Sequence, residues 1–275
     1  MPRPRPTAAV AAAFAAAAVA LAQEPTAPPE SPFLSVRKGN MPVIISAPHG
    51  GMLELPGVPP RRGIGLPTGP NGYYTGRDPG TEELAGMIAV EVFLKTGKRP
   101  YLVAAKFSRR YVDANRPPEL AYESPKARPT YDAYHDKLAA FCKEVRKVHG
   151  RGLLLDVHNQ ASFPESVVRG TRDGGTVALL RQRFGEKAHT GSDSLFGLMG
   201  KAGFKVHPAK LDGKEHADFN GGHIVKTYGS GDFGIDAMQL EFGWMLTTPT
   251  AAPDTAGKLA AVIEQFHKLY LVDAK

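Results

Sequence analysis

Two histidines and a glutamate lie where short apolar runs of the sequence end. His49 and His158 each follow or close an apolar run, and Glu241 closes a third one. Imidazole and carboxylate groups are the ligands of catalytic zinc sites that keep one position open for a water or substrate. The chemistry they indicate is metal-assisted hydrolysis. The three segments read Ser46-Ala47-Pro48-His49-Gly50-Gly51, Leu155-Asp156-Val157-His158-Asn159 and Gln239-Leu240-Glu241-Phe242.

A zinc site built on two histidines needs a third ligand, and three acids compete for that place. Asp78, Glu82 and Glu54 all lie in the stretch that follows His49. We favour Asp78, although an acid just before a predicted helix could equally favour the helix amino terminus. Glu82 falls in the first predicted helical turn, where an acid is favourable without any ligand role. The expected ligands are therefore His49, Asp78 and His158, with Glu82 and Glu54 as alternatives.

Two further acids have expected roles beside the metal. Asp156 and His158 share one face of a predicted strand, so Asp156 can act as a partner that orients the histidine. Glu241, at the end of its strand, could take a proton from water as a general base. A salt-bridged strand end is the alternative interpretation of Glu241.

A ten-residue segment supplies donors for an anion: Ser108-Arg109-Arg110-Tyr111-Val112-Asp113-Ala114-Asn115-Arg116-Pro117. Arginine presents a planar pair of donors that matches a carboxylate. We expect Arg109, Asn115 and Arg116 to bind a substrate carboxylate, and Arg110 to lie at the surface. His223, after Gly221-Gly222, is a weaker candidate for lining the same pocket.

Strand and helix patterns alternate along the chain. Such alternation predicts an α/β fold with a mostly parallel sheet, in which ligands bind beyond the carboxyl ends of the strands. The 27 residues from Met52 to Asp78 form a long Pro- and Gly-rich loop. Continuous apolar runs predict strands at 43–46, 101–105, 152–157, 204–206, 224–226 and 237–242, and helical spacing predicts helices at 81–94, 131–148, 177–184, 194–202 and 255–269.

The amino terminus has the pattern of a secretory signal peptide. Arg3 and Arg5 precede an uncharged apolar stretch at 7–21, which is too short for a membrane span. We therefore expect a signal peptide at 1–22, a disordered linker at 23–35 and a single catalytic domain at 36–275. The mature protein would be periplasmic or secreted, with no stable membrane insertion. Cys142, the sole cysteine, can form no internal disulfide and is expected to be a buried apolar residue.

The net charge is modestly basic and selects no partner by itself. It is +7 for the whole chain, and removing Arg3 and Arg5 leaves +5. The basic residues are spread out rather than gathered in a run, which argues against nucleic-acid binding. A mildly basic surface suits anionic substrates or an anionic envelope. The oligomeric state stays open.

Taken together, these segments resemble the N-formylglutamate amidohydrolase family. The resemblance runs from about residue 40 to 245, and Asn-Arg-Pro after Ser-Arg is its most specific part. The family is similar in fold and site to zinc carboxypeptidases and aspartoacylases, which implies a three-layer α/β/α fold. It implies one Zn²⁺ per chain held by His49, His158 and an acid, here Asp78. It also implies that Glu241 activates water and that Arg109, Asn115 and Arg116 hold the substrate carboxylate.

The resemblance predicts a reaction more firmly than a substrate. Formylglutamate is degraded in the cytoplasm, whereas this chain carries an export pattern. We expect a zinc-dependent amidohydrolase acting on a carboxylate-bearing N-acyl amino acid or a short peptide. The alternatives are an exported metallopeptidase of the carboxypeptidase type and a non-catalytic protein that binds anionic ligands.

Overall fold

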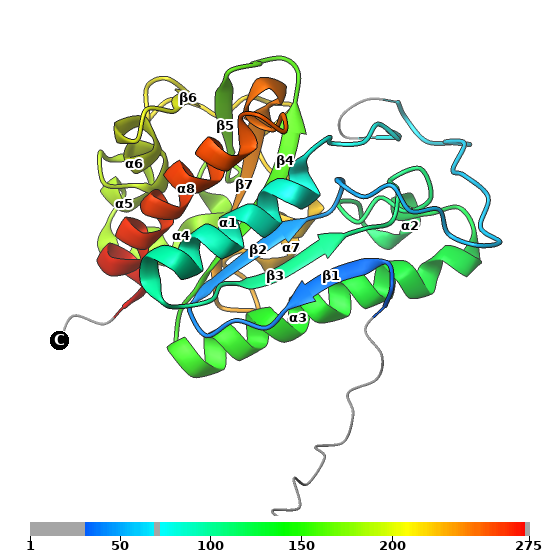
Figure 1. Ribbon diagram of the computed structural model, residues 1–275, viewed down its shortest axis with the longest axis horizontal. Helices are drawn as coiled ribbons and strands as arrows, with labels where there is room; N and C mark the ends of the chain where they lie inside the picture. The colour runs from blue at the N-terminus through cyan, green and yellow to red at the C-terminus, as the bar shows by residue number, and fades with distance from the viewer. Residues whose placement is uncertain (1–30, 69–71, 273–275) are drawn as a thin grey trace, which may run out of the picture. The chain divides into compact units, whose positions relative to one another are not determined.

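A mixed sheet of seven strands is the centre of the computed structural model, which describes residues 31–68 and 72–272 (Figure 1). Its order is β1-β3-β2-β4-β7-β5-β6. The four central strands β3, β2, β4 and β7 are parallel, β1 is antiparallel to β3, and β5 and β6 run antiparallel to β7. The strands are β1 (Leu34–Arg37), β2 (Val43–Ala47), β3 (Tyr101–Ala105), β4 (Leu153–Gln160), β5 (Ser166–Gly170), β6 (Lys205–His207) and β7 (Asp236–Gly243).

Helices cover both faces of the sheet. On one face α1 and α8 pack side by side, and on the other lie α3 and α7 (Figure 1). This is the predicted three-layer α/β/α fold. The helices are α1 (Thr81–Thr96), α2 (Pro118–Ala121), α3 (Arg128–His149), α4 (Ala178–Phe184), α5 (Lys187–Thr190), α6 (Leu195–Lys201), α7 (His223–Tyr228) and α8 (Ala252–Phe266), with short turns η1 (Pro125–Ala127), η2 (Gly175–Val177), η3 (Trp244–Leu246) and η4 (His267–Leu271).

Strand parity determines which side chains reach the site. Ile44, Leu154 and Ala237 belong to the apolar core beneath α3 and α7. Side chains two and four positions later on a strand point to the same face. On β4 those positions are Asp156 and His158, and on β7 they are Gln239 and Glu241. On this face of the sheet, the side chains are therefore apolar beneath the helices and polar where the strands end.

The strand predicted at 224–226 is wrong, because these residues lie in helix α7. Ile224 and Val225 are both buried. Their β-branched side chains suggested a strand, but this short helix packs them between β7 and the core under α3. The N–H group of Ile224, at the start of this helix, donates to Asn115 Oδ1 at 2.9 Å. Tertiary contacts have thus decided against local propensity.

Two strands were not predicted, and both lie toward an edge of the sheet. β1 begins at Leu34, inside the segment expected to be linker, and pairs only with β3 among the described strands. β5 is five residues long and ends in Arg169-Gly170. The predicted signal peptide and residues 23–30 of the predicted linker lie outside the described residues. Within the described part of the chain, no helix has the length and apolar character needed to cross a bilayer.

Cys142 is buried in α3, and this gives a first prediction. Its side chain has no exposed surface, and burial raises the pKa of its thiol. Because the thiolate is the reactive form, the native protein should not react with an aromatic disulfide reagent over hours. The unfolded protein should release one equivalent of chromophore per chain. Rapid labelling of the native protein would contradict the burial. The Cys142→Ser variant, which should give no signal in either state, is the control.

Candidate active site

The predicted site residues gather in one pocket beyond the carboxyl ends of β2, β4 and β7. Its volume is about 510 Å³. One side is formed by the loops after β2 and β3, and the far wall by residues 159–162 and 218–222. Seven of the residues singled out in the sequence line it: His49, Asp78, Arg109, Asn115, Arg116, His158 and Glu241.

His49 is placed by a tight turn after β2. The two glycines after His49 allow this turn to pack closely against the neighbouring segments of the chain. A Cβ atom on Gly50 would lie 2.4 Å from the backbone nitrogen of Glu82, and one on Gly51 would lie 2.3 Å from the carbonyl carbon of Lys106. Such distances are far below van der Waals contact, so larger residues would displace the histidine.

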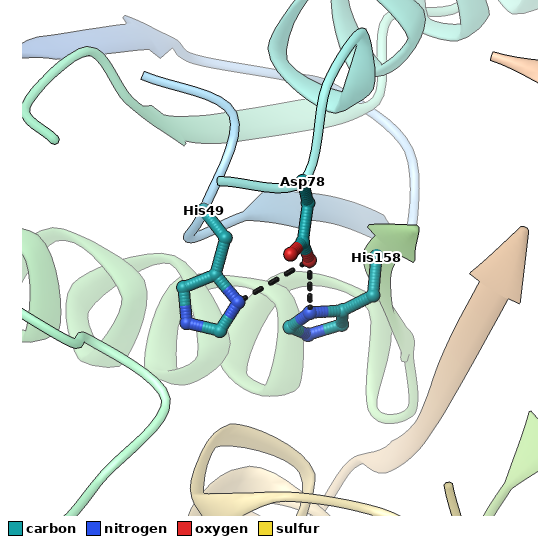
Figure 2. Close-up of side chains that lie close together, drawn as sticks. All are labelled: His49, Asp78 and His158. Atoms are coloured by element: carbon teal, nitrogen blue, oxygen red, sulfur yellow. Dashed lines mark hydrogen bonds and ion pairs between the residues drawn. The ribbon is translucent and has the colours of Figure 1, made fainter. Parts of the chain in front are cut away.

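His49, Asp78 and His158 converge on one point (Figure 2). Their ligand-type atoms lie within 4.8 Å of one another, and all three side chains are buried. Asp78 Oδ2 is 3.3 Å from Nδ1 of His49 and 3.1 Å from Nδ1 of His158. Two imidazole nitrogens and one carboxylate are the donor set of an open zinc site. The residues present therefore fit a zinc ion.

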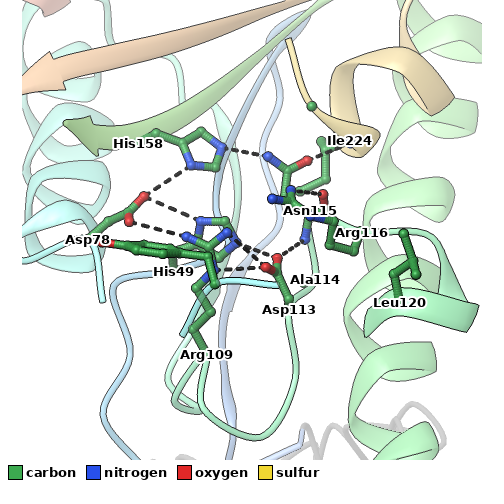
Figure 3. Close-up of polar contacts among 12 residues, drawn as sticks. His49, Asp78, Arg109, Asp113, Ala114, Asn115, Arg116, Leu120, His158 and Ile224 are labelled. Atoms are coloured by element: carbon green, nitrogen blue, oxygen red, sulfur yellow. Dashed lines mark hydrogen bonds and ion pairs between the residues drawn. The ribbon is translucent and has the colours of Figure 1, made fainter. Parts of the chain in front are cut away.

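Each histidine is fixed from behind by a second carboxylate. Asp113 Oδ1 lies 2.7 Å from Nε2 of His49 (Figure 3). Asp156 Oδ2 lies 2.8 Å from Nε2 of His158. Both rings therefore turn Nδ1 toward Asp78. Metal-binding histidines are usually oriented in this way, by a carboxylate on the nitrogen that does not bind the metal. The partnership of Asp156 and His158 was expected from their shared strand face.

Asp113 was not assigned a role from the sequence, although it lies within the motif that was singled out. It is fully buried and also accepts from the backbone N–H of Asn115 at 3.0 Å. The guanidinium of Arg109 donates to its Oδ2 at 2.8 Å through Nε. One carboxylate thus links His49 to the segment 108–117.

Asp113→Asn is expected to weaken zinc binding by roughly 10- to 100-fold, the usual effect of losing a carboxylate behind a metal-binding histidine. The amide keeps the size of the side chain but removes the charge that fixes the imidazole and pairs with Arg109. Competition with a chelating dye measures the affinity. Asp132→Asn is the matched control, since Asp132 is an acid of α3 that only forms a surface pair with Arg128. Equal affinities in the two variants would refute the role of Asp113.

In this cluster, close pairing of opposite charges shifts the pKa values more than burial does. Burial alone would raise the pKa of Asp78, but the two imidazoles lower it below its ordinary value. Burial would also raise the pKa of Asp113, yet Arg109 and His49 hold it well below normal. For His158 burial acts downward, but Asp156 raises its pKa well above the usual value. A cation bound here would take the place of the proton on that ring.

The arginines are placed at the pocket, but Arg109 has acidic partners that the sequence did not reveal. Besides pairing with Asp113, its guanidinium lies 3.7 Å from Asp78 Oδ1 and 4.9 Å from the centre of the Tyr74 ring. Arg116 donates to the carbonyl groups of Gly72, at 3.2 Å, and Asn115, at 3.0 Å. Arg110 is exposed, as predicted.

Asn115 is held on several sides. Its Oδ1 accepts from the N–H of Ile224, and its Nδ2 lies 3.3 Å from Nε2 of His158 and 3.5 Å from the side-chain oxygen of Gln239. Gln239 in turn accepts from the N–H of Gly222 at 2.7 Å. Asn115 and Gln239 therefore connect the segment 108–117 to β4 and β7 through hydrogen bonds.

His223 is not among the residues that line the pocket. It starts α7 on the side toward α3, with its ring 3.4 Å from the Tyr131 hydroxyl and 5.6 Å between ring centres from His135. The glycines before it line the pocket instead.

Glu241 lies beside His158, since the two residues are direct partners on neighbouring strands. It is buried, and its Oε1 accepts from Gln239 Nε2 at 2.8 Å. Burial raises the pKa of Glu241 to about 8, with Asp78 and Asp156 adding to the rise. The competing ligand candidates are elsewhere: Glu82 is half-buried in α1 and Glu54 is exposed, and neither lines the pocket.

Comparison with solved structures shows a shared fold. N-formylglutamate amidohydrolase from Ralstonia eutropha JMP134 aligns with 86% of this chain and 97% of its own, with a TM-score of 0.56 and 15% identity. A bacteriophage poly-gamma-glutamate hydrolase aligns with 86% of this chain and 89% of its own, with a TM-score of 0.40 and 12% identity. An N-acetylmuramyl-L-alanine amidase from Mycobacterium smegmatis covers 82% and 97%, with a TM-score of 0.36 and 12% identity. No protein-family model and no curated protein matches the sequence.

Proposed function

We propose that this chain is a zinc-dependent amidohydrolase that cleaves the amide of a small carboxylate-bearing substrate, such as an N-acyl amino acid. One observation carries the proposal: a buried His-Asp-His group, a buried glutamate and two arginines line the same pocket. Each group alone has a structural explanation. Their convergence at the carboxyl edge of a parallel sheet supports a catalytic one. The fold shared with N-formylglutamate amidohydrolase, named for such a substrate, agrees with it.

The zinc ion would be held by His49, Asp78 and His158. When bound, zinc supplies a Lewis acid that polarises a carbonyl and lowers the pKa of water to about 7. The protein supplies orientation of the rings, through Asp113 and Asp156, and a buried setting in which charges act strongly.

Glu241 is the residue that moves protons in this proposal. Its carboxylate accepts a proton from the attacking water and delivers it to the nitrogen of the leaving amine. A neutral carboxyl with a pKa of about 8 would be a poor acceptor at neutral pH. A cation among its neighbours favours the charged form, so metal binding would bring Glu241 into its working state.

The opposite part of the substrate would be held by its carboxylate. Arg116 and Arg109 line the pocket beside the metal group, with Asn115 between them. Arg109 is largely committed to Asp113. We propose that Arg109 and Arg116 hold the substrate anion together.

The proposal is tested by measuring bound metal and hydrolysis in the same preparation. The substrates are N-formyl-L-glutamate, N-acetyl amino acids, short peptides and the same compounds with the carboxylate converted to an amide. Near-stoichiometric zinc with cleavage of the carboxylate forms is expected. Preference for peptides would favour the metallopeptidase alternative. Tight binding of carboxylates without zinc or turnover would replace the enzyme by an anion-binding protein.

Arg116→Lys should raise the KM for the carboxylate substrate by roughly 10-fold or more, since charged hydrogen bonds contribute about 1.5–3 kcal/mol. Lysine keeps the charge but loses the planar pair of donors. The kcat should change little, and the amide form of the substrate should show no difference. Arg110→Lys, at an exposed position, is the matched control. An equal rise in KM for both substrate forms would argue against carboxylate recognition by Arg116.

A further inference from the structure

A second cavity lies at the amino edge of the sheet, where β4 and β7 begin, at the edge opposite the candidate active site. Its volume is about 360 Å³. The C-terminal ends of α1, α3 and α8 gather on this side (Figure 1). Three arginines from different segments line the cavity: Arg146 of α3, Arg151 before β4 and Arg183 of α4. We call it the basic cavity.

Apolar side chains surround these cations. Leu179, Leu180 and Leu271 line the basic cavity, together with the rings of Phe184 and Tyr270, whose centres are 5.1 Å apart. Phe184 lines the cavity and is 37% exposed to solvent. Val148 (62% exposed), Leu269 (44%) and Val272 (38%) are close in sequence to lining residues and are also exposed. Exposed apolar groups interleaved with cations are typical of interaction sites.

The charge at this edge is positive beyond the cavity itself. Lys98 and Lys268 lie near His267, where, after burial, they act to lower the pKa of that imidazole, and Lys268 is also paired with Glu264 at 2.6 Å. Lys147 is exposed beside Arg146. Among the described lining residues the one carboxylate is Asp236, which is buried and accepts from the N–H of Leu180 at 3.1 Å. Its charge is therefore directed into the protein.

Helix ends explain part of this pattern but not all of it. Cations are favoured at helix C-termini, and Arg146 donates to the carbonyl of Gly150 just after α3. That effect accounts for basic residues at the last turns of α3 and α4. It gives no reason for exposed leucine, valine and phenylalanine side chains among them.

We propose that the amino edge of the sheet docks on an anionic lipid bilayer. Guanidinium groups of the basic cavity bind lipid phosphates, which match their planar donors. Each lysine or arginine near such a surface strengthens the attraction to anionic lipid. Val148, Phe184 and Leu269 enter the boundary between headgroups and acyl chains. The candidate active site then opens away from the membrane. The inference is independent of the proposed hydrolase reaction.

Vesicle sedimentation tests the proposal with the full chain. The unchanged protein should bind vesicles containing phosphatidylglycerol, should bind phosphatidylcholine vesicles far less, and should be released by salt. Lys147→Glu with Arg183→Glu should weaken binding to phosphatidylglycerol vesicles by at least about tenfold. Val148→Ser should weaken it by a smaller factor at constant charge. Because residues 1–30 are identical in every variant, they cannot cause a difference between them.

The matched control is Arg110→Glu with Lys126→Glu, which reverses two exposed cations near the other edge and gives the same net charge. This variant should bind as the unchanged protein does. Equal losses in both double variants would mean that only net charge matters, and would overturn the proposal. So would equal binding to both kinds of vesicle, or no binding at all. A higher Tm in inorganic phosphate, without any binding to vesicles, would indicate an ordinary anion site and would overturn the proposal.

Discussion

The His49→Ala and His158→Ala proteins are expected to purify without bound zinc, whereas the unchanged chain is expected to carry near-stoichiometric zinc. Each substitution removes one of three ligands and leaves a site with two, which is too few for a stable zinc centre. The loss of affinity should exceed the roughly 10- to 100-fold expected for Asp113→Asn, because a ligand acts directly and its partner acts through it. Elemental analysis of the purified proteins measures the metal.

Two matched variants make this result specific. Glu82→Gln and Glu54→Gln remove the acids that compete with Asp78 in the sequence, and both should keep their zinc. Asp78→Asn, which preserves side-chain size, should lose it. Near-stoichiometric zinc in both histidine variants would show that the ion binds elsewhere, and would remove the metal from this pocket.

Folding must be followed in the same samples, because His158 is buried against two carboxylates. Removing one partner of a buried charged pair typically costs about 3–5 kcal/mol. His158→Ala is thus expected to unfold at a lower temperature than the unchanged metal-free protein. Asp78→Asn should be less affected, since the amide can still hydrogen-bond. Loss of zinc from Asp78→Asn, with a Tm closer than that of His158→Ala to the Tm of the unchanged metal-free protein, therefore separates metal binding from folding.

The sequence predicted the residues of this site better than their partners. His49, His158 and Glu241 could be placed because each follows or ends a buried parallel strand, and such ends meet at one edge of a sheet. Parity on β4 also placed Asp156 beside His158. These inferences need only local periodicity and a general rule of sheet topology.

Contacts between distant segments could not be predicted in this way. Asp113 reaches His49 across 64 positions of sequence, and only the fold brings the loop after β3 to the turn after β2. Asp113 also pairs with Arg109, four positions before it in the same segment, although the motif suggested a free donor. The place of His223 differs from the expected one for a local reason, because the two apolar residues after it, Ile224 and Val225, fit a strand and a helical turn equally well.

Glu241→Gln is expected to keep its zinc and its fold while lowering kcat by roughly 10²- to 10⁴-fold, the usual contribution of a general base. The amide has the size of the carboxyl and can still accept from Gln239, so packing changes little. It cannot take a proton from water. Steady-state kinetics on the best substrate of the panel, with zinc analysis of the same sample, measures both effects.

Glu241→Asp and the pH profile distinguish a base from a structural residue. Aspartate keeps the charge but draws the carboxylate back, so the kcat of this variant should fall between those of the unchanged protein and Glu241→Gln.

A general base must be ionised, so activity of the unchanged enzyme should fall as pH drops below the pKa of Glu241. A zinc ion bound as proposed would lower that pKa from the value of about 8 set by burial, so the acidic limb should lie below pH 8. In Glu241→Gln this limb should be absent from the residual activity. A variant with full activity, or one that retains the limb, would assign the proton transfer to another group.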